Sequence, residues 1–534
     1  MLRQISSKGI YALLLLTILL RVEHRYFYRN FYVDTEIQIA AAANLLKANG
    51  LSLAQADPLS LSISYQPLFG FTPGYSLLMI PPYLLLKNWI WASFLLDCVA
   101  IILLFAAIHL WFRFTFEKKR NTYYSLFLVF AAFSPAPFHY LTASGLWACA
   151  TFAWGLYALY RILDEPSDKK WMFQAILILA MFFSVLLRYA YVSVAILPPI
   201  MMAFVAWQKK DKGLCSMAII NMLMLSLLLG GLAIYQYSIQ GSVNYLQASS
   251  RGFFPAHLLS IDPFPFKAFV YYGIPHELYV KELSAYLYVG LKSISYICSA
   301  FILFLLLFHW IKPGALRNTA ISSPKMGTWL LISLCVIFAN VAILAYLSLK
   351  VPAESWNWTS FWTYVMESRY YMPSMLVILL SVYGLAEASA IYLFRQLIRA
   401  MLLVALLASM SYPLYLKYQI HIQHEWENTF VYSDIPQILE QIDSLTQADE
   451  QPVIFSSNPL RRCAEWLGVA SLPWEAFIEL DTLTIPQNCH LIVYVAAEES
   501  LDKNSSFLLE SFDRYQLNHG VLFHRHFRAA SSRQ

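Results

Sequence analysis

Long apolar runs follow one another from the start of the chain to about residue 416, and short polar or basic stretches separate them. A run of roughly 17–25 apolar residues can cross a bilayer as a helix. Eleven runs approach this length, at residues 9–22, 89–113, 122–141, 145–163, 171–187, 189–207, 214–235, 288–311, 327–349, 372–394 and 400–416. The pattern predicts an α-helical polytopic membrane protein of about eleven transmembrane helices.

Residues 66–86 are also apolar, but we expect them to lie in the membrane interface rather than to span it. With that assignment, the basic loops all fall on one side, which the positive-inside rule makes cytoplasmic. Fifteen Lys and Arg residues lie in these loops, at 113–120, 161–170, 208–212, 312–325 and 395–399. Pro73, Pro81 and Pro82 also disfavour a regular spanning helix. The N-terminus is then predicted to be cytoplasmic, and an odd number of spans places the C-terminal tail outside.

The chain is predicted to divide into a membrane domain, residues 1–416, and a soluble domain, residues 417–534. Three long segments of the membrane domain lie on the predicted outer face, at residues 23–88, 236–287 and 350–371. In the tail, helix-like segments at 434–445, 460–467 and 498–515 alternate with strand-like segments at 452–456, 490–495 and 521–527. This alternation predicts a small extracytoplasmic α/β domain.

Composition and charge agree with this division. The chain is 59% hydrophobic and 13% charged, whereas an ordinary soluble domain is about 25% charged. These values exclude a soluble enzyme, a disordered chain and a coiled coil. The tail holds 8 Lys or Arg and 16 Asp or Glu, a net of −8, so the net charge of +5 leaves +13 for residues 1–416. Because that basic excess falls in short loops between apolar runs, it indicates contact with membrane lipids and no nucleic-acid partner.

Asp34 is the first candidate for chemistry. It opens a helix-like segment in the first outer segment, residues 34–50, which closes with Asn49 and Gly50 as a stop signal. A carboxylate at the start of a helix commonly caps it. The local sequence alone therefore favours capping over catalysis for Asp34.

Three short motifs, in their order along the chain, resemble a known family. The first is the acidic residue Asp34 at the head of its helix, and the second is the segment Thr72-Pro73-Gly74-Tyr75. The third is an Arg-Tyr pair, Arg369 and Tyr370, which precedes an apolar helix. In order and topology the chain resembles the GT-C superfamily of polytopic glycosyltransferases. This superfamily includes protein O-mannosyltransferases and lipid A aminoarabinose transferases.

The resemblance implies an enzyme that takes a sugar from a polyprenyl-phosphate carrier. Such an enzyme attaches the sugar to a lipid, glycan or protein acceptor at the extracytoplasmic face. It implies that Asp34 acts as the base for the acceptor nucleophile, or supports that base. Arg369, with Tyr370 beside it, is the best candidate for binding the carrier phosphate, because a guanidinium matches phosphate oxygens and stays protonated.

The chain departs from the family pattern in the second outer loop. Many family members carry a second carboxylate there, where this chain has His139 and no acidic residue. Either Glu36 or His139 takes that part, or one carboxylate is enough. Arg188, between the fifth and sixth predicted spans, is either an interface anchor or a group that faces a cavity. A divalent metal is not favoured, because His276-Glu277 lacks a second histidine at helical spacing.

The leading hypothesis is thus a membrane glycosyltransferase, and the compact loops favour a bacterial inner membrane. The alternative is a transporter or flippase, or a non-catalytic membrane subunit of a cell-surface glycan assembly system. A transporter should show internal repeats and broken or charged helices near the bilayer midplane, and the sequence shows neither. Cys463 and Cys489 in the tail could pair in an oxidising compartment, but their spacing does not decide this.

Overall fold

A computed structural model gives the fold of most of the chain. It describes residues 7–27, 33–57, 63–68, 71–116, 122–133, 143–164, 170–240, 284–316, 323–350 and 370–403, and shorter stretches between 406 and 527. The chain forms two compact units. The first unit contains residues 1–28 and 94–417, and the second contains residues 29–93 and 418–534. The first outer segment therefore folds together with the C-terminal region.

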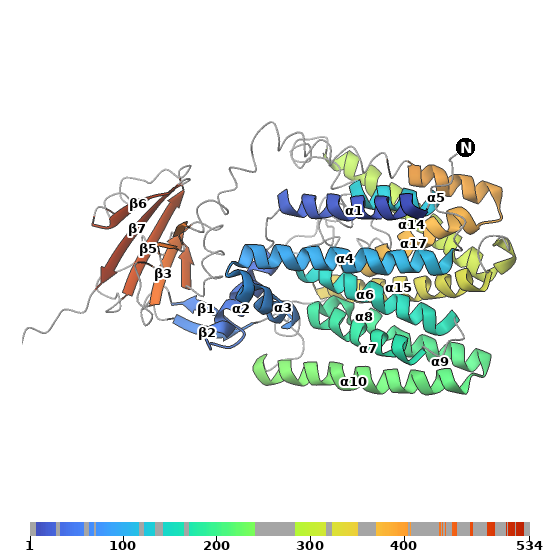
Figure 1. Cartoon of the computed structure of the whole chain (residues 1–534), viewed down its shortest axis with the longest axis horizontal. Coiled ribbons are helices and arrows are strands. Elements are labelled where there is room, and N and C mark those ends of the chain that lie inside the picture. Colours follow the sequence, from blue (N-terminus) through green and yellow to red (C-terminus); the bar gives the residue numbers. More distant parts are fainter. Residues whose placement is uncertain are drawn as a thin grey trace, which may run out of the picture. The chain divides into compact units, whose positions relative to one another are not determined.

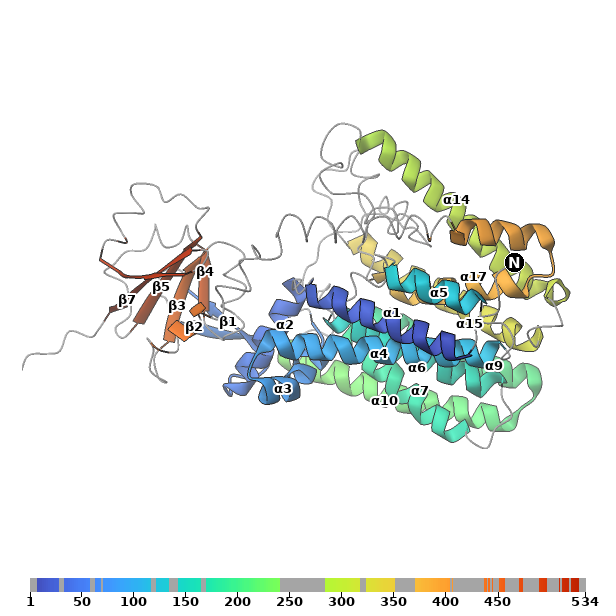
Figure 2. The ribbon, with the colours of Figure 1, turned by 45° about the horizontal axis from the view of Figure 1, so that its top comes forward.

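The first unit is a bundle of helices that run side by side (Figures 1 and 2). Its helices are α1 (Ser7–Phe27), α4 (Trp89–Thr115, from Phe94 onward), α5 (Thr122–Phe133), α6 (Ala143–Asp164), α7 (Lys170–Leu187), α8 (Val192–Ala195), α9 (Leu197–Lys209), α10 (Lys212–Gln240), α14 (Ser284–Ile311), α15 (Ser323–Lys350) and α17 (Met372–Ala388). Two 3₁₀ turns, η1 (Tyr189–Tyr191) and η3 (Pro313–Ala315), lie between them.

Among the described residues, six helices are long and apolar enough to cross a membrane. They are Trp89–Thr115, Ala143–Asp164, Lys170–Leu187, Tyr189–Lys209, Lys212–Ile239 and Lys325–Tyr346. Shorter apolar helices accompany them at Thr122–Ala132, Tyr296–Ile311 and Met372–Ala388. The chain is therefore a largely helical, multi-pass membrane protein, whereas the total of eleven spans stays a prediction.

One predicted boundary is wrong. The sequence pattern places a span at 372–394 and a basic loop at 395–399, but α17 already ends at Ala388. The backbone of Ser389 pairs with Leu316, and a second helix then runs from residue 392 to 403. Arg395 and Arg399 therefore lie on a helix. The residues on both sides of this turn are apolar, so the pattern of apolar runs does not reveal the turn.

A buried ion pair holds three helices of the first unit together. Arg25 of α1 binds the carboxylate of Asp97 on α4, and both side chains are almost fully buried. The other carboxylate oxygen of Asp97 accepts a hydrogen bond from the backbone N–H of Ala143, the first residue of α6, at 2.9 Å. One turn earlier on α1, Arg21 donates to the carbonyl of Ala131 near the end of α5. Since an ionised group inside a membrane protein needs such partners, these bonds fix how α1, α4 and α6 meet.

The second unit begins with α2 (Val33–Leu46), which is followed by the hairpin of β1 (Ser52–Ala56) and β2 (Ile63–Pro67) and by α3 (Gly74–Leu86). Helix α2 ends at Leu46, before the predicted stop signal at Asn49 and Gly50, and Ala48, with a φ of +64°, is the first left-handed residue after it. Every residue of α2 from Gln38 to Asn44 is buried. Despite Pro81 and Pro82, α3 is a helix. Its 13 residues are too short to span a bilayer.

The C-terminal part of the second unit is a five-stranded mixed sheet with strand order β4-β3-β5-β7-β6. Its strands are β3 (Gln451–Ser456), β4 (Ala470–Pro473), β5 (Cys489–Ala496), β6 (Asp513–Gln516) and β7 (Gly520–Phe527). Strands β3, β4 and β5 are parallel, whereas β7 is antiparallel to β5 and β6. The three longer strands match the prediction. The helix predicted for 498–515 is wrong at its end, because β6 begins at Asp513.

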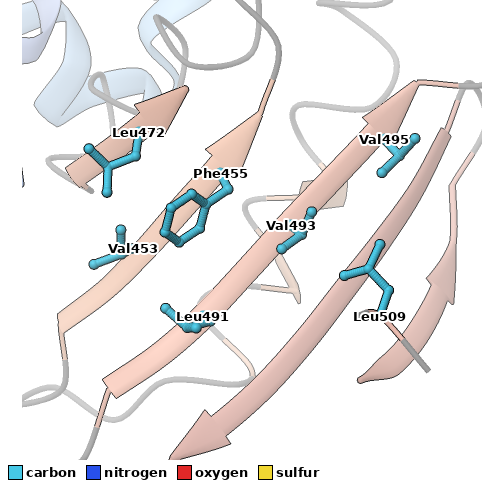
Figure 3. Close-up of a cluster of buried hydrophobic side chains, with 7 residues drawn as sticks. All are labelled: Val453, Phe455, Leu472, Leu491, Val493, Val495 and Leu509. Atoms are coloured by element: carbon cyan, nitrogen blue, oxygen red, sulfur yellow. The ribbon is translucent and has the colours of Figure 1, made fainter. Parts of the chain in front are cut away.

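The two faces of this sheet differ in chemistry. One face carries an apolar cluster, shown in Figure 3, of Val453, Phe455, Leu472, Leu491, Val493, Val495 and Leu509. The other face carries three histidines from β5 and β7. The rings of His490 and His526 stack at 4.0 Å between centroids, and Nδ1 of His490 lies 2.9 Å from Nε2 of His524. Asp513 of β6 pairs with His524 in the strand register. Cys463 lies outside the described residues, so its pairing with Cys489 stays open.

The Arg25–Asp97 pair leads to a first prediction. In Asp97→Asn, the buried Arg25 charge loses its counter-charge, and removal of one partner of a buried pair costs about 3–5 kcal/mol. The double variant Arg25→Met/Asp97→Asn removes both charges and should lose less stability. The measurement is the unfolding free energy in detergent. If the double variant is less stable than Asp97→Asn, the unpaired charge of Arg25 is not what destabilises Asp97→Asn.

The histidine face leads to a second prediction. Burial, together with the neighbouring His490 and His526, lowers the pKa of His524 below its ordinary value. The unfolded chain therefore binds more protons than the folded one, and stability falls as the pH drops below the unfolded value of about 6.5. Amide exchange in β5 and β7, corrected for its intrinsic pH dependence, should accelerate between about pH 7.5 and about pH 5.5. His524→Asn should weaken this response. An equal acid response in the variant would exclude His524 as its source.

Candidate functional site

The structure places some of the candidate residues and leaves others outside its described part. Arg188 and Tyr370 are described in the first unit, and Glu36 in the second. Asp34 is described as backbone within α2. His139 and Arg369 lie outside the described residues.

Arg188 lies at the turn between two membrane helices. Helix α7 ends at Leu187, and Arg188 itself is extended, with φ of −155° and ψ of 120°, before η1 begins. Its N–H still donates to the carbonyl of Ser184 at 3.0 Å, and its own carbonyl accepts the N–H of Tyr191 at 3.1 Å. The backbone is thus fixed on both sides, while the side chain is only partly buried. This is the position at the end of a span that the sequence predicts for Arg188.

The Arg188 guanidinium lies over the aromatic ring of Tyr370, 5.2 Å from the ring centroid. Tyr370 comes directly before Tyr371, which is the N-cap residue of α17. A cation over an aromatic face is stabilised by about 0.5–2 kcal/mol, depending on desolvation. Two of the sequence candidates, far apart in the chain, therefore lie together in the fold.

A polar network buried between α15 and α17 holds Tyr370 in place. The side-chain amide of Asn340 donates to the carbonyl of Tyr370 at 3.1 Å. The hydroxyl of Ser374 donates to Oδ1 of Asn340 at 2.6 Å, and both side chains are fully buried. Tyr371, Leu344 and Met375 pack around this point. Sequence reasoning missed Asn340, although a polar side chain inside an apolar span is itself a signal of an internal hydrogen bond.

Two hydroxyl groups shortly after Arg188 in the sequence have no hydrogen-bond partner within the part of the chain that the structure describes. They are Oη of Tyr189 and Oγ of Ser193, and both atoms are buried. Since buried polar atoms are nearly always paired in folded proteins, such atoms mark places where water or a ligand binds. The guanidinium of Arg188, which lies over an aromatic ring, has the chemistry to bind an anionic ligand rich in oxygen, such as a sugar phosphate.

The first turn of helix α2 includes two acidic residues of the first outer segment, Asp34 and Glu36. Because Val33 is already helical, Asp34 lies inside this turn rather than at the capping position. A carboxylate there interacts favourably with the helix dipole, by about 0.3–1 kcal/mol. Glu36 is half-buried, and Thr35 and Gln38 beside it are buried.

No metal centre is evident within the described ranges. Among those residues, no group of three or more His, Cys, Asp or Glu side chains is placed to hold a metal ion. The three histidines of the C-terminal sheet stack on and hydrogen-bond to one another rather than converging on a common point. The segment with His276 and Glu277 lies outside the described residues.

Comparison with known proteins identifies the fold. No protein-family model matches the sequence, and no curated protein matches it. A crystal structure of ArnT from Cupriavidus metallidurans bound to undecaprenyl phosphate matches with a TM-score of 0.52, over 98% of this chain and 99% of that one. The chain has the ArnT fold. The sequence identity is 12%, so the likeness lies in the arrangement of the elements and not in the residues.

A second ArnT crystal structure, from the same organism in the apo state, covers 92% of this chain and 93% of that one, at 10% identity and a TM-score of 0.44. ArnT is a lipid A aminoarabinose transferase of the GT-C type. The first of these structures confirms, at the level of the fold, the resemblance inferred from three short motifs. The roles of individual residues are not tested by this likeness.

Proposed function

We propose that this chain is an integral membrane glycosyltransferase that uses a polyprenyl-phosphate-linked sugar as its donor. The observation that carries the proposal is the end-to-end match of the fold to ArnT, which was crystallised with undecaprenyl phosphate. Because one fold can serve several functions, the proposal also needs a site. The arginine and aromatic pair of Arg188 and Tyr370 supplies groups of the required chemistry.

In the proposed reaction, a hydroxyl or amine of a lipid, glycan or protein acceptor attacks the anomeric carbon of the sugar. The bond from that carbon to the carrier phosphate breaks, and the phosphate leaves with its electron pair. Asp34 receives the proton of the acceptor or holds the acceptor for that transfer. Glu36 and His139 are proposed to bind substrate near Asp34. No cofactor is required for this balance of atoms and electrons.

The leaving phosphate gains negative charge as the bond breaks, so a fixed positive charge near it stabilises the transition state. We assign this role to two arginines that neighbour Tyr370, namely Arg188 and Arg369. Arg188 lies over the Tyr370 ring, and Arg369 precedes Tyr370 in the sequence. A guanidinium binds phosphate oxygens through its edge and lies on an aromatic ring through its face, so the two kinds of contact use different parts of the group.

The proposed reaction takes place at the extracytoplasmic face of a bacterial inner membrane. The positive-inside rule places the N-terminus in the cytoplasm and residues 417–534 outside. The same rule places the first outer segment, with Asp34, on the outer side. A substrate carried on a lipid would then reach the site from within the bilayer.

The direct experiment incubates the purified protein, in nanodiscs, with radiolabelled polyprenyl-phosphate sugars and with lipid A, lipid-linked glycan or peptide acceptors. The proposal expects label to move from the carrier to one of these acceptors, with release of polyprenyl phosphate. Absence of transfer for every donor and acceptor pair, by a protein that is folded and monodisperse, contradicts it.

Replacement of Asp34 separates catalysis from a helix-end role. Asp34→Asn keeps the size of the side chain but cannot take up a proton, so turnover should fall about 10²–10⁴-fold. The loss of the helix-dipole interaction should cost only about 0.3–1 kcal/mol. Asp57→Asn is the matched control, because Asp57 is an exposed carboxylate of the same outer segment. Turnover like that of the wild type in Asp34→Asn would leave Asp34 with a structural role.

Replacement of Arg188 tests the phosphate contact. Arg188→Lys keeps the positive charge but loses the planar stack on Tyr370 and the two-pronged geometry. We expect KM for the lipid donor to rise about tenfold, the equivalent of one charge-assisted hydrogen bond of about 1.4 kcal/mol. Arg113→Lys is the control, since Arg113 is exposed near the far end of α4. An unchanged donor KM in Arg188→Lys would remove this residue from the site.

A further inference from the structure

The apolar core of the C-terminal sheet continues onto the first outer segment. Ile63 of β2 packs against the cluster of buried side chains on the sheet that Figure 3 shows. Strand β1 also lies against β4, which is the edge strand of the sheet. An exposed strand edge is usually covered by another element of the chain. The first-segment hairpin therefore acts as a cover for the C-terminal domain, although it is distant in sequence.

The register of the hairpin shows which of its faces is used. Ala54 pairs with Tyr65, and Ile63 lies two residues before Tyr65 on β2, so the side chains of Ala54, Ile63 and Tyr65 share one face. On that face Ala54 is 5% exposed, and Ile63 and Tyr65 are half-buried. On the opposite face Ser64 is exposed. Ile63 and Ser64 are thus adjacent residues with opposite environments.

The hairpin is rigidly joined to α2. The side chain of Asn44, which is fully buried near the end of α2, donates to the carbonyl of Ser52 at 2.8 Å. The carbonyl of Asn44 accepts the N–H of Asn49 at 3.0 Å, and the hydroxyl of Ser52 donates to the carbonyl of Asn49 at 2.8 Å. The turn between α2 and β1 is therefore closed by three hydrogen bonds. A shift of β1 would carry the end of α2 with it.

Helix α2 has little room to move independently, because it packs on α3 and β1 and its residues Ile39–Ala42 are 0% exposed. From these contacts we propose that the C-terminal domain is a positioning element: it holds the hairpin through Ile63, and the hairpin holds the helix that carries Asp34. The domain then acts on the reaction without touching substrate. Ile63 is a positioning residue in this scheme.

The catalytic consequence rests on the proposed function, in which Asp34 must lie within hydrogen-bond reach of the acceptor. A displacement of about 1 Å of a catalytic group can cost about 10²-fold in rate. Loss of the Ile63 contact should therefore lower kcat while leaving the binding of the lipid donor unchanged. The structural consequence, a looser α2, does not depend on the reaction.

The first arm of the test measures hydrogen exchange in the full-length protein. In Ile63→Asn, amides of residues 39–46 should exchange at least about tenfold faster, while those of α6 and α7 keep their wild-type rates. Ser64→Asn makes the same substitution at the neighbouring exposed position and should leave α2 unchanged. Ile63→Val, which retains most of the apolar contact, should restore protection.

The second arm measures transfer kinetics with the lipid-linked donor. In Ile63→Asn, kcat should fall about ten- to a hundredfold with an unchanged donor KM, and Ile63→Val should recover most of the rate. The wild-type protein serves as the reference in each assay. If the wild type transfers no sugar, the proposed function fails, and the exchange arm still decides whether the domain holds α2.

Wild-type exchange in α2 of Ile63→Asn would overturn the proposal, because the hairpin would then not hold the helix. A loosened α2 with wild-type kcat would also overturn it. If exchange rises throughout the chain, the substitution has disturbed the whole fold, and the milder Ile63→Ala decides between the same two results. Loosening of α2 with a loss of kcat, reversed by Ile63→Val, supports the proposal.

Discussion

The ion pair of Arg25 and Asp97 is the interaction on which the arrangement of the helical bundle depends. Inside an apolar surrounding, neither charge is tolerated without the other. The carboxylate also accepts the first backbone N–H of α6, so a single side chain joins three helices. Apolar packing alone orients helices only weakly in a membrane, because lipid tails compete for the same contacts. A directional polar contact of this kind fixes which helices meet and at what height.

A second buried polar contact, between α15 and α17, is also directional, and it involves Tyr370 of the candidate site. Asn340 binds both Ser374 and the carbonyl of Tyr370, so the start of α17 cannot slide along α15. The Tyr370 ring is thereby fixed beneath Arg188. Arg188 supplies a permanent positive charge, which the proposed stabilisation of a leaving phosphate requires. The site thus depends on bonds that lie within the bundle rather than in loops.

Apolar runs sufficed to predict most of the membrane helices, because a span needs only length and hydropathy. They failed at Ser389, where the chain turns between apolar segments, and at α2, whose buried residues come from packing that no local pattern reveals. The short edge strands β4 and β6 were missed because four residues carry little alternation. Arg188 and Tyr370 were each identified from the sequence. Their contact was not, because nothing local links residues so far apart. Ile63 carried no signal, since its role depends on a sheet formed by the other end of the chain.

The central claim is that a polyprenyl phosphate binds beside Arg188 and Tyr370. A cryo-electron microscopy structure of the wild-type protein in nanodiscs, with undecaprenyl phosphate at saturating concentration, tests it most directly. The account predicts density for the phosphate within hydrogen-bond distance of the Arg188 guanidinium, which should still rest on the Tyr370 ring. Phosphate density elsewhere in the protein, with Arg188 in contact only with protein or water, would contradict it.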